Sequence, residues 1–286
     1  MVLSRRRFLQ LSAGVLSGAA LGVAGTSLYE PHETTVSQVG ITLKRLHPAF
    51  DGLRIAQLSD IHFNSFMTAG HLEKVIEVTN AQKPDVVILT GDFVTAGVSE
   101  TPSDARAEQA WPCASVLHKL ESPLGCYAVL GNHDYDTNAD IVAEALSAGA
   151  RIEVLRNKAT VIQKDGARLW LAGVDDVTAS RAKPDDALRG VPRQECTIVA
   201  VHEPDFADEM LKYPVDLQVS GHSHGGQIRF PVVGALYLPT WARKYPQGYY
   251  RFGDYQLYTN RGIGVIGLPM RLMCPPEITI FTLKTS

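Results

Sequence analysis

The stretch Leu53-Arg54-Ile55-Ala56-Gln57-Leu58-Ser59-Asp60-Ile61-His62 decides the fold. Its apolar residues predict a strand that ends at Ser59-Asp60, so that an Asp-x-His triplet follows the strand directly. Apolar residues at helical spacing over 69–82 then precede a second apolar strand. The same combination of an apolar strand and a polar motif recurs at 86–89 before Gly91-Asp92, and at 126–130 before Gly131-Asn132-His133-Asp134. This alternation of strands and helices predicts an α/β protein.

The second half of the chain is richer in predicted strands. The strand at 196–201 precedes His202-Glu203, and the strand at 216–220 precedes Gly221-His222-Ser223-His224-Gly225. Two sheets are therefore expected, and because no linker separates the halves we predict a single domain over 35–286. The remaining expected strands are 35–46, 159–164, 168–174, 226–230, 249–252, 255–259 and 277–284, and the remaining expected helices are 103–120, 138–148, 184–189 and 204–212.

Composition excludes several classes of protein. The chain has 286 residues and a formal net charge of -3, so it has no basic surface of the kind that holds nucleic acid. Its four cysteines are widely spaced and form no CxxC pair, which argues against a zinc ribbon or a thioredoxin-like site. Two alternatives remain for them: buried free thiols, or one disulfide if the protein is exported.

Residues 1–29 have the layout of an export signal. Arg5-Arg6-Arg7 precede a stretch from Phe8 to Tyr29 without a charged residue. Ser-Arg-Arg-x-Phe-Leu resembles the twin-arginine signal, which implies the twin-arginine machinery as a partner and export of the folded protein. A plain membrane anchor is the alternative, because the apolar stretch is about long enough to span a bilayer. Whether the segment is cleaved stays open. The expected location is the periplasm, or the outer face of the cytoplasmic membrane and cell wall.

The five polar motifs predict a metal site. Ligands of α/β sheets bind at the carboxyl ends of strands, so loops far apart in sequence converge there. Together the motifs supply two Asp, one Asn and four His as candidate ligands, plus one further His, which exceeds the four ligands of a structural zinc. Imidazole and carboxylate ligands suit manganese, iron or zinc, whereas calcium prefers oxygen. The candidate ligands are Asp60, His62, Asp92, Asn132, His202, His222 and His224.

The order of these motifs resembles the calcineurin-like metallophosphoesterase family, whose pattern is D-x-H, G-D, G-N-H-[DE], H and G-H-x-H. The resemblance implies a four-layer α/β/β/α sandwich of two mixed β-sheets and two divalent metal ions. It implies that Asp60, His62 and His224 hold the first metal, that Asn132, His202 and His222 hold the second, and that Asp92 bridges them. His133 would bind a phosphate oxygen or protonate the leaving group, and Asp134 would orient His133. A metal-bridging hydroxide would attack phosphorus in line.

The C-terminal part, from Gly225-Gly226-Gln227 to Cys274-Pro275-Pro276, resembles the exported YkuE/YaeI-like branch of bacterial phosphodiesterases. This favours a phosphodiesterase or pyrophosphatase acting on an envelope phospholipid, a lipid-linked phosphate ester or a wall-associated phosphate ester. The alternatives are a phosphomonoesterase or nucleotidase, and a metal-binding envelope scaffold with little catalysis. Two loops, 241–250 and 268–273, either form a rim that meets a membrane surface or pack on the sheet. Arg261 is a candidate for holding a second phosphate.

Overall fold

The computed structural model describes residues 25–28, 33–96 and 103–286. Most of the segment predicted to be a signal or anchor lies outside the described residues, which include only a short helical piece at 25–28 from it. Among the helices of the described ranges, none has the length and apolar character needed to cross a bilayer.

The first sheet has six strands in the order β1-β14-β2-β3-β4-β5. Strands β2 to β5 run parallel to one another, β14 runs antiparallel to β2, and β1 runs parallel to β14. The three parallel strands β2, β3 and β4 therefore end at one edge of the sheet. The bounds are β1 Thr35–Leu43, β2 Arg54–Leu58, β3 Val86–Thr90, β4 Cys126–Val129, β5 Glu153–Val154 and β14 Glu277–Thr285.

The second sheet also has six strands, in the order β12-β13-β9-β8-β7-β6. Its four central strands are parallel, and β12 and β6 are antiparallel edges. The bounds are β6 Lys158–Lys164, β7 Ala167–Gly173, β8 Thr197–Ala200, β9 Leu217–Ser220, β12 Gly248–Phe252 and β13 Tyr255–Thr259. A separate hairpin pairs β10, Arg229–Phe230, with β11, Gly234–Ala235.

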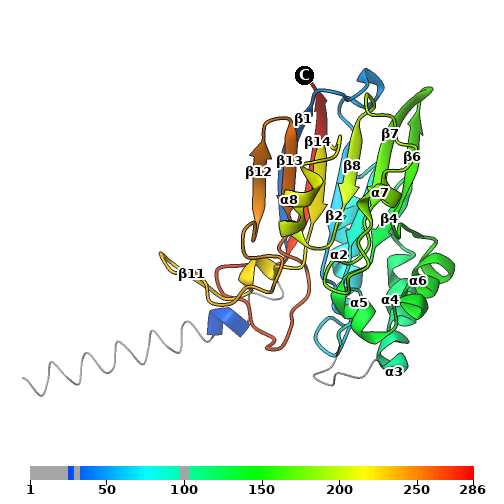
Figure 1. The fold of residues 1–286 in the computed structure, drawn as a ribbon. Coiled ribbons are helices and arrows are strands. Elements are labelled where there is room, and N and C mark those ends of the chain that lie inside the picture. The colour runs from blue at the N-terminus through cyan, green and yellow to red at the C-terminus, as the bar shows by residue number, and fades with distance from the viewer. Residues whose placement is uncertain (1–24, 29–32, 97–102) are drawn as a thin grey trace, which may run out of the picture.

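Helices cover the outer faces of both sheets (Figure 1). Side chains alternate along each strand, so Ile55 and Ile88 pack between the sheets while Ala56 and Leu89 face the helices. On the first sheet the cover is α2 Ala69–Ala81, α3 Asp104–Ala107, α4 Ala110–Leu117, α5 Asn132–Thr137, α6 Ala139–Glu144 and the π-helical turn Ala145–Gly149. On the second sheet it is thinner, consisting of α7 Pro184–Ala187, α8 Ala207–Met210 and the 3-10 turn Pro204–Phe206. Further 3-10 turns are Pro48–Phe50 and His224–Gly226. The expected four-layer α/β/β/α sandwich of two mixed sheets is confirmed.

Two local expectations were wrong. The strand expected over 226–230 is reduced to Arg229–Phe230, because Gly225, Gly226 and Gln227 all have positive φ, a conformation that no strand accommodates. The polar motif after β4 is the first turn of α5 rather than a loop, since the Asp134 carboxylate accepts a hydrogen bond from the backbone N–H of Gly131 at 2.9 Å. The four cysteines are free, and all but Cys126 are buried.

Candidate metal centre

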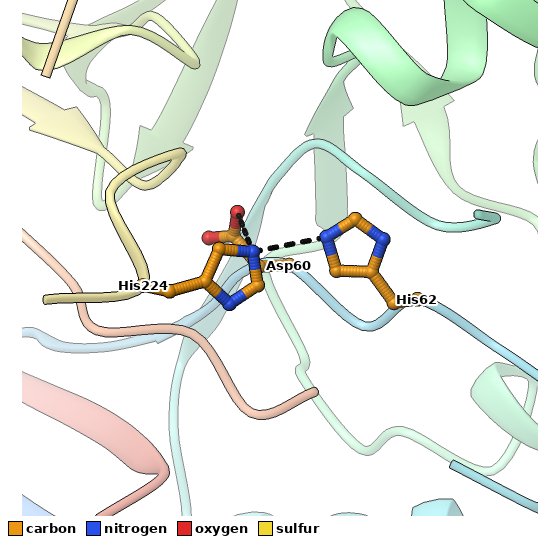
Figure 2. Close-up of side chains that lie close together, drawn as sticks. All are labelled: Asp60, His62 and His224. Carbon is orange, nitrogen blue, oxygen red and sulfur yellow. Dashed lines mark hydrogen bonds and ion pairs between the residues drawn. The ribbon is translucent and has the colours of Figure 1, made fainter. Parts of the chain in front are cut away.

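The first group of candidate ligands combines both sheets. Asp60 and His62 follow β2 of the first sheet, and His224 follows β9 of the second (Figure 2). The Nε2 atom of His224 lies 3.0 Å from Nε2 of His62 and 3.4 Å from Oδ1 of Asp60. All three side chains are buried, so their polar atoms face one another instead of water.

A second group lies beside the first. Asp92 follows β3, while His202 and His222 follow β8 and β9, and their ligand atoms lie within 4.8 Å of one another. Oδ2 of Asp92 is 3.3 Å from Nε2 of His202 and 3.5 Å from Nε2 of His62, so this carboxylate stands between the two groups. Asn132, at the first position of α5, has a buried Oδ1 with no hydrogen-bond partner.

Backbone carbonyls orient two of the imidazoles. Nδ1 of His202 donates to the carbonyl of Thr90 at 2.6 Å, and Nε2 of His222 donates to the carbonyl of Thr240 at 2.8 Å. A neutral imidazole carries one proton, so in that form these bonds leave Nε2 of His202 and Nδ1 of His222 as ligand atoms. His202, whose pKa is raised by Asp92, has to give up a second proton from Nε2 to reach that form. The carboxylate of Asp60, which follows the first sheet, accepts a hydrogen bond from the backbone N–H of His222, which follows the second sheet, at 3.1 Å.

The backbone of the site is strained where the ligands are attached. Five candidate ligands have positive φ values of 47° to 65°, namely Asp60, His62, Asp92, His222 and His224. Such a conformation costs about 1–3 kcal/mol for a residue with a side chain, and it persists only where the surroundings impose it. Two glycines allow the close approach: a Cβ on Gly131 would lie 2.7 Å from Nε2 of His202, and one on Gly221 would lie 2.5 Å from Oδ2 of Asp60.

Burial sets the protonation of the groups. Burial lowers the pKa of His62 to about 3, and it also lowers the pKa values of His222 and His224. The imidazoles are thus neutral near pH 7, the form that binds metal. Burial raises the pKa of Asp60 to about 6. For His202, burial would lower the pKa, but the neighbouring Asp92 carboxylate outweighs it and raises that pKa well above its usual value.

His133 and Asp134 differ in what they contact. Nδ1 of His133 accepts from the backbone N–H of Ala96 at 3.0 Å, which leaves its Nε2–H as a donor. The carboxylate of Asp134 accepts instead from the N–H groups of Asp92, Phe93 and Gly131 at 2.8–2.9 Å. The expectation that Asp134 orients His133 therefore needs correction, since the structure has Asp134 fastening the Asp92 loop to the start of α5. The reason is geometric, because a side chain at the third helical position points back to the N-terminal N–H groups.

The donor set fits metal ions. Oδ1 of Asn132 is buried without a hydrogen-bond partner, and an unmet buried polar atom costs about 1–3 kcal/mol. Nε2 of His202 has only the Asp92 carboxylate beside it, at 3.3 Å. Two Nε2 atoms, of His62 and His224, face each other beside a carboxylate. Cations at these positions would satisfy the unpaired atoms and offset the strain of the ligand backbones.

Some contributors to the site carried no signal in the sequence, whereas Arg261, which the sequence marked as a candidate phosphate ligand, is held by other partners. The carbonyls of Thr90 and Thr240 act through the backbone, which any residue supplies. Asp176 and Glu203 form a buried pair beneath His202, in which burial and the Glu203 charge raise the pKa of Asp176 to about 10. Arg261 forms an ion pair with Glu277 at 3.1 Å and donates to Oγ1 of Thr35 at 3.2 Å, so it is engaged in a structural contact.

A cavity of about 410 Å³ opens onto the ligands. Asp92, Asn132, His133, His222 and His224 form its polar wall. Its apolar wall comes from the hairpin region and a later loop. The sequence had marked the 268–273 loop as a candidate rim but gave no sign of the contribution from the hairpin region. The apolar lining residues are Ile228, Leu236, Tyr237, Pro239, Ile266 and Leu268.

The Asp, Asn and His side chains gather at the strand ends of a two-sheet sandwich. This arrangement is typical of metal-dependent hydrolases. The model of the calcineurin-like phosphoesterase family matches residues 53–226. Metallophosphoesterase YkuE of Bacillus subtilis is 35% identical over 289 residues, covering 99% of each chain. Phosphodiesterase YaeI of Escherichia coli is 32% identical over 99% of this chain and 100% of its own. UDP-2,3-diacylglucosamine pyrophosphatase LpxG of Chlamydia trachomatis is 28% identical over 93% of this chain and 94% of its own.

The chain belongs to the calcineurin-like phosphoesterase family, and its relatives include the YkuE and YaeI proteins. It is accordingly a metal-dependent hydrolase of phosphoric esters. The predicted roles of the individual residues, the identity of the metals and the cellular location stay predictions.

Proposed function

We propose that this protein is a dinuclear-metal phosphodiesterase or pyrophosphatase that cleaves a lipid-linked phosphate ester in the cell envelope. The observation that carries the proposal is the cavity, in which the candidate ligands face a wall of apolar side chains. A phosphate at the polar wall would leave an attached acyl or polyprenyl group against Ile228, Leu236 and Leu268. Burial of such a group contributes about 0.8 kcal/mol per methylene. The similarity to LpxG, a UDP-2,3-diacylglucosamine pyrophosphatase, supports a lipid-linked substrate.

In this proposal Asp60, His62 and His224 would hold one ion, Asn132, His202 and His222 would hold the other, and Asp92, which lies between the two groups, would contribute to both. Two divalent ions, whether manganese, iron or zinc, would supply Lewis acidity toward the phosphate and the means to ionise water near neutral pH. The backbone carbonyls of Thr90 and Thr240 keep His202 and His222 in the tautomers that ligate. Apart from the ions, the chain itself supplies position and one proton donor.

That donor is His133. Its Nδ1 accepts a hydrogen bond from the backbone N–H of Ala96, so the neutral ring carries its proton on Nε2 and can donate it to a substrate. The side chain lines the cavity beside Asp92. It is placed to bind a non-bridging phosphate oxygen or to protonate the departing oxygen, as general acid catalysis requires.

We further propose export by the twin-arginine route and a location in the periplasm or at the outer face of the cytoplasmic membrane and cell wall. The support is the sequence Ser4-Arg5-Arg6-Arg7-Phe8-Leu9 and the uncharged stretch that follows it. Replacing Arg5 and Arg6 with Lys should leave the protein in the cytoplasm, which fractionation and a blot would detect. Unchanged export of this variant would remove the proposal.

The activity test compares bis-p-nitrophenyl phosphate with p-nitrophenyl phosphate, using the full chain with added manganese. Preferential turnover of the diester, lost in His133→Ala, is the expected result. Preference for the monoester would indicate a phosphomonoesterase or nucleotidase. Bound metal without turnover under any divalent ion would indicate a scaffold. A lipid extract incubated with the enzyme would then show by mass spectrometry which phosphorylated species disappears.

A further inference from the structure

The hairpin formed by β10 and β11 exposes an unusual amount of apolar surface. It projects to the left from the lower end of the sandwich, on the side away from helices α3 to α6 (Figure 1). At its tip Val232 is fully exposed and Val233 is 70% exposed, and behind it Leu236 and Tyr237 are 62% and 73% exposed. From Phe230 to Pro239 no residue is charged. An uncharged apolar tip is costly in water and marks an interaction surface.

The backbone conformation at the tip also indicates an interaction surface. Val232 has a φ of +70°, in the left-handed region that favours glycine, asparagine and aspartate. A β-branched residue is a genuine outlier there, and the side chain touches little of its own protein, so packing does not explain it. The strain is understandable if the side chain is needed by something outside the chain.

A second loop extends the surface. The backbone N–H of Arg229 donates to the carbonyl of Leu272 at 2.9 Å, and that of Leu272 donates to Gln227 at 3.0 Å, so the hairpin and the 266–273 loop lie side by side. This loop exposes Leu268 and Met273, at 61% and 58%. Leu236 and Leu268 also line the cavity, so the surface continues into the site.

The N-terminal segment reaches the same place. The backbone N–H of Arg271 donates to the carbonyl of Ser27 at 2.9 Å, and Leu28 is 54% exposed. The helical piece at 25–28 lies near the hairpin in Figure 1. The sequence before it is uncharged as far back as Phe8 and about long enough to span a bilayer. The chain thus enters the described structure beside the exposed apolar residues.

We propose that this apolar surface, defined by Val232, Val233, Leu236, Tyr237, Leu268 and Met273, inserts into the interface of a lipid bilayer. The insertion places the cavity mouth at the headgroup level, where a lipid-linked phosphate enters without leaving the membrane. The entry of a lipid-linked phosphate rests on the proposed function, whereas the insertion of the surface into the bilayer does not. A lipid surface fits better than a protein partner for two reasons. Residues 25–28, which directly follow the uncharged stretch in the sequence, lie beside this surface, and the six residues that define the surface carry no charge for a partner to pair with.

Insertion is tested with the full chain carrying Val233→Trp, mixed with vesicles of phosphatidylethanolamine and phosphatidylglycerol that contain lipids brominated in their acyl chains. Bromine quenches tryptophan only within the bilayer. We expect blue-shifted emission and quenching beyond that of the unsubstituted chain, whose three tryptophans set the background. Leu211→Trp is the matched control, because Leu211 is 41% exposed at the end of α8, and we expect it to add no quenching.

A companion variant adds Val232→Asp to Val233→Trp. Aspartate accepts the left-handed backbone, so the hairpin keeps its shape, and we expect quenching to return to background. A blue shift without bromine quenching would mean that the reporter is buried against another copy of the chain and not in lipid, and it would overturn the proposal. Equal quenching of the reporter and unsubstituted chains would overturn it as well. Turnover of bis-p-nitrophenyl phosphate is measured in parallel. Its absence in the unsubstituted chain would remove the proposed function and leave the quenching result to decide insertion.

Discussion

The two walls of the cavity are built in opposite ways. In the polar wall Asp92, His222 and His224 are buried and have strained backbones, while Asn132 and His133 are half-buried. The apolar wall comes from the hairpin and the 266–273 loop, where Leu236, Tyr237 and Leu268 remain exposed. The family match ends at residue 226, so the ligands lie within it and the apolar wall lies beyond it. We therefore expect the chemistry to depend on the family-matched part, and we propose that substrate choice depends on the residues that follow it.

The largest effect is expected at the polar wall. Asp92→Asn removes the charge that stands between the two ligand groups, so kcat/KM for bis-p-nitrophenyl phosphate should fall about 10²- to 10³-fold. Bound metal, measured by plasma mass spectrometry, should fall with it. Asp254→Asn, on an exposed carboxylate that pairs with Lys44, serves as control and should change neither value. Full activity of Asp92→Asn would dismiss the assigned metal site.

An intermediate effect is expected at the apolar wall. Leu236→Ser together with Leu268→Ser should slow hydrolysis of a lipid-linked diester in vesicles about tenfold, because less apolar surface meets the lipid. Turnover of bis-p-nitrophenyl phosphate should not change, since that substrate has no chain to bury. Leu211→Ser is the control at a distant exposed position. Equal losses on both substrates would show that the apolar wall does not act by binding the lipid chain.

The third prediction concerns the pH dependence of stability that the buried Asp176 causes. The pKa of Asp176 is raised to about 10, mainly by burial, so its proton stays bound in the folded protein while the unfolded chain loses it above about pH 4. The folded state therefore binds more protons, and Asp176 lowers stability as pH rises from about 4 to 10. Asp176→Asn keeps a hydrogen-bond donor for Glu203 and does not titrate. Each pH unit between the two pKa values changes the free energy of unfolding by about 1.4 kcal/mol, so the Tm advantage of Asp176→Asn should grow by about 2–4 °C for each pH unit from pH 5 to pH 9. A difference that is constant across pH would contradict the buried protonated carboxyl.

The smallest effect separates Arg261 from the site. Arg261→Gln removes the partner of the buried Glu277 carboxylate, which should cost about 1 kcal/mol after allowance for partial exposure of the arginine. Tm should fall by about 2–4 °C, as differential scanning calorimetry can show. KM for bis-p-nitrophenyl phosphate should stay the same, because the guanidinium is engaged away from the cavity. A raised KM would restore Arg261 as a phosphate ligand.

Sequence reasoning went furthest where a local pattern carries the structural signal. The strand before Asp60 and the strand before Asp92 are short apolar runs that only a buried sheet explains, and both were located within a residue. It failed where backbone geometry depends on distant contacts. The expected strand over 226–230 was wrong because the turn at Gly225 to Gln227 is held by Cys274 and the 266–273 loop. The sequence around 225–227 does not predict that contact.

The sequence by itself determined the order of strands and helices and the set of residue types at the strand ends, because periodicity and motif spacing are local properties of the chain. Only the tertiary structure decided which side chains meet. His224 faces His62 across the two sheets, His202 donates to the carbonyl of Thr90, and Asp134 holds the Asp92 loop rather than His133. It also decided that the apolar hairpin stands beside the N-terminal segment. These contacts join residues far apart in sequence, and packing of the two sheets is the physical event that brings them together.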